Sequence, residues 1–232
     1  ARWTKDLDIF SMKFLFVPIV ERMHWSMAIV CNLDCLEDYL EWRRRQHAAG
    51  AARRAAQRLS PLSPPRVPCV LFMDSLNMHS ATTVAANLKA WLKHEWRAKK
   101  AKKRASKSSS STAATQPQTD DGDNSGSGDG EGGALSFDDL DTLVEELFGE
   151  AGPQGLALLR PKVPKQDNHT DCGLFALQYE EEVIRRSPDI LPENLARETV
   201  PGFSRRMFSI GDMHEKRKNM KELVKELIDT YN

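Results

Sequence analysis

One stretch of the sequence runs from a polar loop into a single cysteine: Val163-Pro164-Lys165-Gln166-Asp167-Asn168-His169-Thr170-Asp171-Cys172-Gly173. Asp, Asn and Thr favour turns because their side chains bond to nearby backbone groups. A helical pattern of apolar residues begins directly after Cys172. A thiol at a helix N-terminus lies at the positive end of the helix dipole, which favours the nucleophilic thiolate. The alternative is a half-buried structural cysteine that begins a core helix.

Two neighbours of Cys172 fit nucleophilic chemistry. Gly173 has no side chain and leaves room for a substrate backbone to come close. Gln166, six positions upstream of the cysteine, carries an amide N–H group that could reach an oxyanion.

A cysteine nucleophile needs a base, and the base needs a group that orients it. Among the six histidines, His24 is best placed, because it stands at the mouth of an apolar strand expected over residues 26–31. A second apolar run, residues 69–73, ends in Asp74. If these two strands are neighbours, His24 and Asp74 meet at their ends and one face of the imidazole is left for Cys172. His79, just past the second strand, is an alternative base.

These residues resemble a known family, the SUMO-specific cysteine proteases, which are also called ubiquitin-like-protein-specific or sentrin-specific proteases. The resemblance is carried by His24-Trp25, Asp74-Ser75-Leu76, Gln166-Asp167-Asn168 and Asp171-Cys172-Gly173, in the family's order of His, Asp, Gln and Cys. The flanking Arg2-Trp3-Thr4 and the run of residues 14–18 are also similar. The long helix that ends at Glu95-Trp96, followed by an insertion, most resembles the branch that trims poly-SUMO chains. The resemblance covers about residues 2–35, 66–97 and 158–231.

The resemblance implies an α+β fold of the papain-like cysteine protease superfamily, with a small mixed β-sheet between helices. It implies that His24 is the base and Asp74 its orienting partner. It also implies that the amide of Gln166 and the backbone N–H of Cys172 hold the oxyanion. The expected activity is thiol-dependent hydrolysis after the C-terminal Gly-Gly of SUMO, in lysine conjugates, chains or precursors. No cofactor and no metal are implied.

Substrate binding is assigned to two residues through the same resemblance. In the family, the counterpart of Trp25 covers a narrow tunnel that admits only the Gly-Gly tail of the modifier, and Gly173 leaves room beside it. Three alternatives stay open. The same chemistry could act on ubiquitin or a Nedd-like modifier, or as an acetyltransferase; the chain could bind SUMO without cutting it; or it could be a basic nucleic-acid-binding protein.

Composition limits the other classes of function. The 232 residues carry 33 basic and 33 acidic side chains, but residues 97–107 hold seven Lys or Arg and no acid. This basic run suits a nuclear-import signal, and so a nuclear location with the cytoplasm as second compartment, or a weak nucleic-acid contact through Lys99, Lys100, Lys102, Lys103 and Arg104. The four cysteines have irregular spacing, which indicates a reducing compartment rather than disulfides or zinc. No apolar run is long enough to cross a membrane.

The expected organisation is a catalytic domain formed by residues 1–97 and 135–232, and we expect this domain to lack its N-terminal part. Residues 36–66 are predicted to form a surface insertion whose first part is helical. Residues 98–134 contain no Val, Leu, Ile, Met or aromatic residue, and are predicted to be disordered because nothing there offsets the entropy of ordering.

Four further elements follow from hydrophobic spacing. Residues 14–20 predict a buried strand, and apolar residues from Val84 to Trp96 recur at helical spacing. Residues 137–148 predict an acidic amphipathic helix, which either docks on the modifier or packs on its own domain. The chain ends in a predicted amphipathic helix whose apolar side chains face inward: Met220, Leu223, Val224, Leu227, Ile228 and Tyr231.

Overall fold

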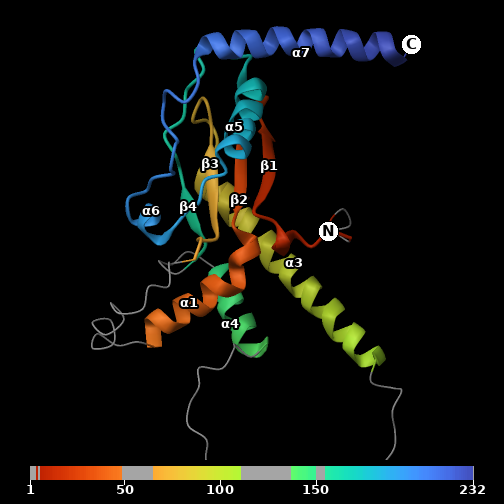
Figure 1. The fold of residues 1–232 in the computed structure, drawn as a ribbon, viewed down its shortest axis with the longest axis vertical. Coiled ribbons are helices and arrows are strands. Elements are labelled where there is room, and N and C mark those ends of the chain that lie inside the picture. The colour runs from red at the N-terminus through yellow and green to blue at the C-terminus, as the bar shows by residue number, and fades with distance from the viewer. Residues whose placement is uncertain (1–3, 5, 49–64, 111–136, 150–154, 232) are drawn as a thin grey trace, which may run out of the picture. The chain divides into compact units, whose positions relative to one another are not determined.

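The computed structural model describes residues 4, 6–48, 65–110, 137–149 and 155–231 (Figure 1). These residues divide into two compact units. One unit contains the sheet, the start of α3 (Ala81–Ser110) and four further helices: α1 (Leu36–Ala48), α5 (Cys172–Arg186), α6 (Pro192–Ala196) and α7 (Ile210–Tyr231). The other unit contains the rest of α3, from Leu88, together with α4 (Phe137–Leu147). Single turns of 3-10 helix occur at Ile9–Ser11 and Leu33–Cys35.

The sheet of the first unit has four strands in the order β1 (Phe14–Glu21), β2 (His24–Cys31), β3 (Cys69–Met73) and β4 (Ala157–Leu159). The β1–β2 and β2–β3 pairs are antiparallel, and the β3–β4 pair is parallel. The predicted α+β class with a small mixed sheet is therefore confirmed. Strand β4 was not predicted, because three residues are too few to show an alternating pattern.

Strand β1 corrects one expectation. Residues 14–20 were predicted to be buried, but most of β1 is only half-buried and Val20 is 55% exposed. The reason is its place at the edge of the sheet, where β2 is its one pairing strand among the described residues. Pro18 fits that place, because proline lacks the N–H group that an inner strand would need.

The core of this unit lies between the sheet and α5, which packs against β2 (Figure 1). Phe175 and Tyr179 of α5 are almost fully buried, and both contact the ring of Phe208, with centroids 5.6 and 5.8 Å apart. The hydroxyl of Tyr179 donates a hydrogen bond of 2.6 Å to the backbone carbonyl of Pro164. That bond ties the loop before Cys172 to the core.

Two predicted insertions are shorter than expected. Helix α3 runs on to Ser110, so residues 98–110, which were predicted to be disordered, form helix. Their Ala, Lys and Arg are good helix formers, and extending an existing helix costs less than nucleating one. In the predicted surface insertion 36–66, Leu36 and Leu40 of α1 are buried in the core. Residues 49–64 and 111–134 lie outside the described part of the chain.

In the second unit, the acidic helix α4 packs against α3. Leu140 and Val144 of α4 are buried. Trp96 of α3 donates a 3.0 Å hydrogen bond to Asp141, and Arg97 of α3 donates two, of 2.6 and 2.7 Å, to Glu145. Of the two alternatives for the acidic helix, packing on its own chain is therefore observed.

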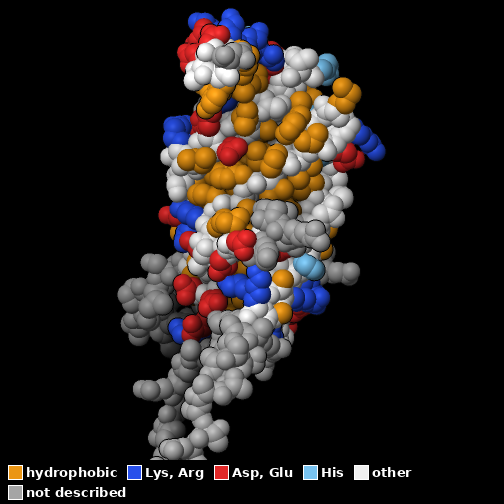
Figure 2. Space-filling model, turned by 90° about the vertical axis from the view of Figure 1, so that its right-hand side faces the viewer, with side chains coloured by type: hydrophobic (Ala, Val, Ile, Leu, Met, Phe, Trp, Pro, Cys, Tyr) orange, Lys and Arg blue, Asp and Glu red, His pale blue; other side chains and the backbone are white. Residues whose placement is uncertain are grey.

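Helix α7 corrects another expectation. Met213, in its first turn, is buried, but the six apolar residues from Met220 to Tyr231 are exposed by 38% to 84%. Only the start of the helix is held against α5, for example through a 3.0 Å hydrogen bond from Lys216 to Gln178. Figure 2 shows hydrophobic side chains gathered on the face of the molecule below the end of this helix. No helix among the described residues is long and apolar enough to span a membrane.

The bond from Tyr179 to Pro164 gives a stability prediction. Tyr179→Phe should lower the free energy of unfolding by about 1–3 kcal/mol, because a buried carbonyl loses its donor. Urea unfolding measures this, and Tyr231→Phe is the matched control, since Tyr231 is 84% exposed and should show no change. Equal stability of the Tyr179 variant and the wild type would mean that the bond does not anchor the loop.

Candidate active site

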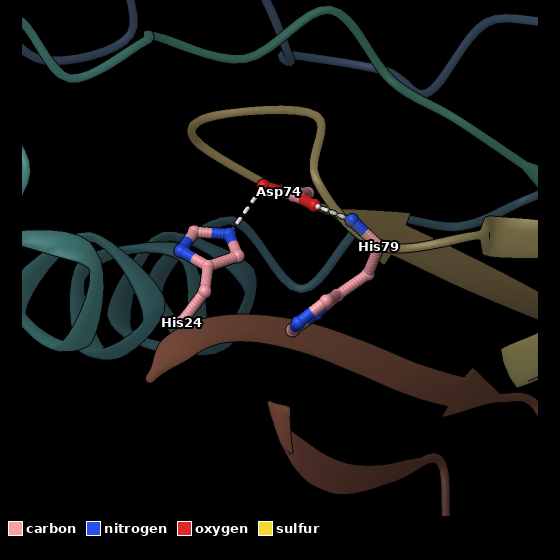
Figure 3. A group of neighbouring side chains, drawn as sticks. All are labelled: His24, Asp74 and His79. Atoms are coloured by element: carbon pink, nitrogen blue, oxygen red, sulfur yellow. Dashed lines mark hydrogen bonds and ion pairs between the residues drawn. The ribbon is translucent and has the colours of Figure 1, made fainter. Parts of the chain in front are cut away.

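The register of the sheet brings His24 and Asp74 together. Met27 of β2 pairs with Met73 of β3, so Asp74, the residue after β3, comes across from Ser26. His24 is two positions before Ser26 and therefore on the same side of β2, diagonal to Asp74. Nε2 of His24 and Oδ1 of Asp74 are 2.7 Å apart, and the two side chains are only 3% and 2% exposed (Figure 3). The expected meeting of these two side chains at the strand ends is thus observed.

Three backbone N–H groups of the turn after β3 donate hydrogen bonds to the carboxylate of Asp74. Oδ1 accepts hydrogen bonds of 2.9 Å from the backbones of Leu76 and Asn77, and Oδ2 accepts one of 2.9 Å from that of His79. Burial by itself would raise the pKa of Asp74. The bonds from the His79 backbone, the His24 ring and the Leu76 backbone outweigh burial and hold the pKa below its usual value. Asp74 is therefore an anion at neutral pH.

The bond to Asp74 determines which nitrogen of His24 is available. A carboxylate can only accept, so Nε2 carries the proton that is donated to Asp74. The other nitrogen, Nδ1, is buried and has no hydrogen-bond partner in the described structure. Nδ1 points away from Asp74 (Figure 3). In the neutral ring it is a free acceptor, as a general base requires.

Cys172 is the first residue of α5 and is 6% exposed. The first bond of the helix runs from the backbone N–H of Phe175 to the carbonyl of Asp171, at 2.9 Å, which leaves the N–H groups of the first turn free of helical partners. A Cβ atom placed on Gly173 would lie 4.0 Å from Cγ of Trp25. Since Trp25 follows His24 and Gly173 follows Cys172, the start of α5 lies against the start of β2.

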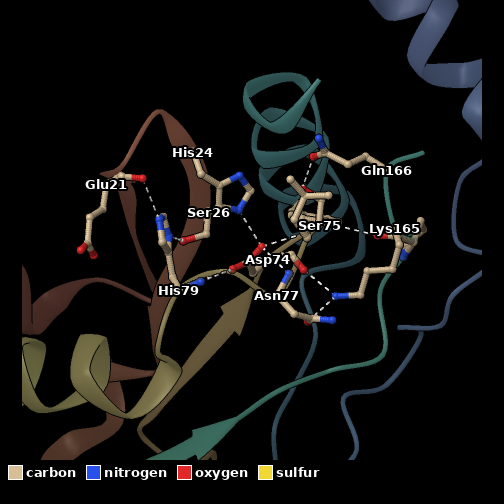
Figure 4. Close-up of polar contacts among 12 residues, drawn as sticks. Glu21, His24, Ser26, Asp74, Ser75, Asn77, His79, Lys165 and Gln166 are labelled. Carbon is tan, nitrogen blue, oxygen red and sulfur yellow. Dashed lines mark hydrogen bonds and ion pairs between the residues drawn. The ribbon is translucent and has the colours of Figure 1, made fainter. Parts of the chain in front are cut away.

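The amide of Gln166 is held at both ends. Its Oε1 accepts a hydrogen bond from the hydroxyl of Ser75, and its Nε2 donates one of 2.7 Å to the backbone carbonyl of Asn168 (Figure 4). Gln166 is 8% exposed. An amide nitrogen carries two hydrogens, so one N–H of Gln166 remains for a substrate oxygen.

An apolar groove of about 830 Å³ borders the site. Trp25, which is 42% exposed, and Gly173 lie on it, and the remaining wall consists mainly of apolar residues from β1, α5 and α7, among them Pro18, Leu174, Leu177, Met220 and Val224. The two residues predicted to bind substrate therefore lie together at an open surface.

His79, the alternative base, is engaged elsewhere. Its ring nitrogens lie 2.7 Å from the Ser26 hydroxyl and 3.1 Å from the carbonyl of Glu21. Together with His24 and Asp74 it forms a group whose ligand atoms lie within 4.8 Å, as a metal site would need. Each of the three already bonds within the protein, and a metal would have to replace those bonds.

The other three cysteines are buried among core residues. Burial raises the pKa of Cys35 to about 11, and burial together with a bond from Cys69 raises that of Cys31. Neither Cys31 nor Cys35 therefore favours the thiolate form. The sequence did not predict the hydrogen bonds of Lys165 and Asn168, although both residues lie in the stretch from Val163 to Gly173. Only their closeness to Gln166 in the sequence could have suggested a role for them.

The lowered pKa of Asp74 predicts how stability depends on pH. Above the ordinary carboxyl pKa of about 3.9, Asp74 contributes its full stabilisation, and this contribution is lost as pH falls through the lower folded pKa. Asp74→Asn should therefore be less stable than the wild type at pH 6, and the difference should shrink between about pH 5 and pH 2. Urea unfolding across this range tests it, with the exposed Asp229→Asn as control. A difference that does not vary with pH would contradict the assignment.

Comparisons with known proteins identify the family of the chain. The model of the Ulp1 protease family, C-terminal catalytic domain, matches residues 1–127, a range that includes His24 and Asp74. The chain is 25% identical to Ubiquitin-like-specific protease 1D of Arabidopsis thaliana over 209 residues, which are 89% of this chain and 24% of that protein. It is 22% identical to Sentrin-specific protease 7 of Mus musculus over 254 residues, 97% of this chain and 20% of that protein. For Ubiquitin-like-specific protease 2 of Schizosaccharomyces pombe the values are 24% over 244 residues, 97% and 29%.

The chain thus spans less than a third of the length of these relatives. The matched family is one of cysteine proteases with a papain-like α+β domain, and the four-stranded mixed sheet with its helices is consistent with that fold. The family expected from the sequence motifs is confirmed: the chain belongs to the Ulp1 protease family.

Proposed function

We propose that this protein is a thiol-dependent isopeptidase and peptidase that cleaves after the C-terminal Gly-Gly of SUMO. The observation that carries the proposal is the buried bond between His24 and Asp74, which leaves Nδ1 of His24 free on the side of the ring away from Asp74. A His–Asp pair near a helix that begins at a cysteine is the arrangement that nucleophilic catalysis by a thiol needs.

The reaction follows from the roles of these groups. Nδ1 of His24 takes the thiol proton of Cys172, and the sulfur attacks the carbonyl carbon of the terminal glycine. The negative charge that develops on the carbonyl oxygen is held by the free amide N–H of Gln166 and the backbone N–H of Cys172, each worth about 3–4 kcal/mol. The C–N bond then breaks, and Nδ1 returns its proton to the leaving amine. Water, deprotonated by the same nitrogen, hydrolyses the thioester.

Asp74 has the same role throughout this cycle. Its carboxylate holds the Nε2 proton of His24, which fixes the tautomer and orientation of the ring and stabilises the imidazolium that forms. The carboxylate itself is kept ionised by the backbone N–H groups around it.

The substrate is proposed from two independent facts. Trp25 and Gly173 border an apolar groove beside Cys172, which suits an extended tail without side chains at its end. The relatives that the chain resembles are named for sentrin or for ubiquitin-like modifiers. The groove suits any Gly-Gly tail, so the choice of SUMO over ubiquitin, a Nedd-like modifier or an acetyl donor rests on the sentrin-specific relative. A silent binding module is the weaker alternative, since such a module needs neither an oriented imidazole nor a bonded Gln166.

We also propose a nuclear location. The basic run that suits an import signal lies on α3, where Lys100 forms an ion pair with Asp141. A weak contact of the same run with nucleic acid would be lost as salt is raised.

The nucleophile can be tested by substitution. Cys172→Ala should abolish covalent labelling by a SUMO probe with a C-terminal electrophile, and Cys31→Ala, Cys35→Ala and Cys69→Ala should keep it. These three variants are matched controls, because they remove the same thiol from equally buried places. Labelling is read as a mass shift on a denaturing gel. Labelling that survives in the Cys172 variant would overturn the assignment, and ubiquitin or Nedd-like probes show whether another modifier is preferred.

A further inference from the structure

We infer that Ser75 and Lys165 are positioning residues, which clamp the turn that carries Asp74 to the loop that carries Gln166. The inference rests on the proposed function, because it concerns how that site holds its oxyanion donor. Neither residue touches the reacting atoms; each acts through a neighbour.

The clamp consists of three contacts between two loops that are about ninety positions apart in sequence. The hydroxyl of Ser75 donates to Oε1 of Gln166. The ammonium of Lys165 donates to the backbone carbonyl of Asp74 and, at 2.7 Å, to Oδ1 of Asn77 (Figure 4). Since Ser75 follows Asp74 and Lys165 precedes Gln166, each loop holds the other at two consecutive residues.

Ser75 and Asn168 together fix which way the amide of Gln166 faces. The carbonyl of Asn168 can only accept, so the nitrogen end of the amide must point to it. The oxygen end then faces Ser75, whose hydroxyl donates to it. With the amide reversed, two oxygens would face each other at Asn168. The observed orientation is the one that leaves an N–H, rather than a carbonyl oxygen, for the substrate.

Lys165 forms the second part of the clamp, through its bonds to the turn that contains Asp74 and Asn77. The turn that it holds is the one whose backbone N–H groups bond to Asp74, and Asn77 within it has a left-handed backbone with φ of 56°. Lys165 therefore supports the backbone that keeps the carboxylate of Asp74 in place. A catalytic group is productive only within about 0.5 Å of its required position, and the clamp sets the spacing between the His24–Asp74 pair and the oxyanion donor.

A double-mutant cycle between Ser75 and Gln166 tests the inference. The substrate is SUMO with a fluorogenic amide at its C-terminus, and kcat and KM are measured separately. Ser75→Ala should lower kcat about tenfold, the effect of one lost hydrogen bond, with KM nearly unchanged. In the Gln166→Ala background the same substitution should change kcat less than about twofold, because the partner through which Ser75 acts is gone.

Ser26→Ala is the matched control. Ser26 is also a buried serine, but its hydroxyl bonds to His79 and not to Gln166. Its effect on kcat should be the same in both backgrounds. For the other side of the clamp, Lys165→Met should lower kcat, Lys165→Arg should restore part of the loss, and Lys162→Met, at an exposed lysine three residues away, should have no effect.

A second measurement separates this inference from the proposed function. The side-chain NH₂ signals of Gln166 in a ¹⁵N NMR spectrum should lie away from their free-amide positions in the wild type, move toward them in Ser75→Ala, and stay in place in Ser26→Ala. A wild type that does not cleave the SUMO substrate contradicts the proposed function, while the NMR result still decides the clamp. Unchanged Gln166 signals in Ser75→Ala, or equal effects of Ser75→Ala on kcat in both backgrounds, would overturn the clamp.

Discussion

The hydrogen bond between Nε2 of His24 and Oδ1 of Asp74 is the interaction on which the candidate site depends. It is 2.7 Å long and lies where both side chains are almost fully buried. A buried carboxylate is costly unless hydrogen bonds compensate it, and here three backbone N–H groups of one turn do so together with the imidazole. The shape of the turn after β3 is thus a condition for an ionised Asp74.

The sheet and α5 supply the other conditions. The antiparallel register of β2 and β3 places Asp74 across from Ser26 and diagonal to His24, and the packing of α5 on β2 brings Gly173 against Trp25. The loop before α5 is anchored from within by Tyr179 and held to the Asp74 turn by Ser75 and Lys165. A few hydrogen bonds therefore join the loop before α5 to the turn after β3, which is distant in sequence. The apolar core holds the sheet and α5, on which these loops are mounted, in fixed positions.

Much of the site could be predicted because its residues stand at element boundaries. His24 begins an apolar run, Asp74 ends another, and Cys172 begins an amphipathic helix, so a guess that the strands are neighbours suffices to join two of them. The wrong predictions concern burial and length. Residues 14–20 have the composition of an inner strand, but sequence does not show that β1 lies at an edge. Helix α3 continues past its apolar residues because propagation needs no apolar contact. The stripe from Met220 to Tyr231 has the spacing of a core helix, and spacing cannot say whether a partner surface is present.

The central claim is that Nδ1 of His24 serves Cys172 while Nε2 stays bonded to Asp74. A crystal structure of the chain joined covalently to SUMO through a C-terminal electrophile measures this directly. The account predicts a bond from Sγ of Cys172 to the modifier, with Nδ1 of His24 within hydrogen-bonding distance of that sulfur. Nε2 should remain bonded to Asp74, and the Gln166 amide nitrogen should face the glycine oxygen. An adduct on another residue, or an imidazole whose Nδ1 faces away from the sulfur, would contradict the account.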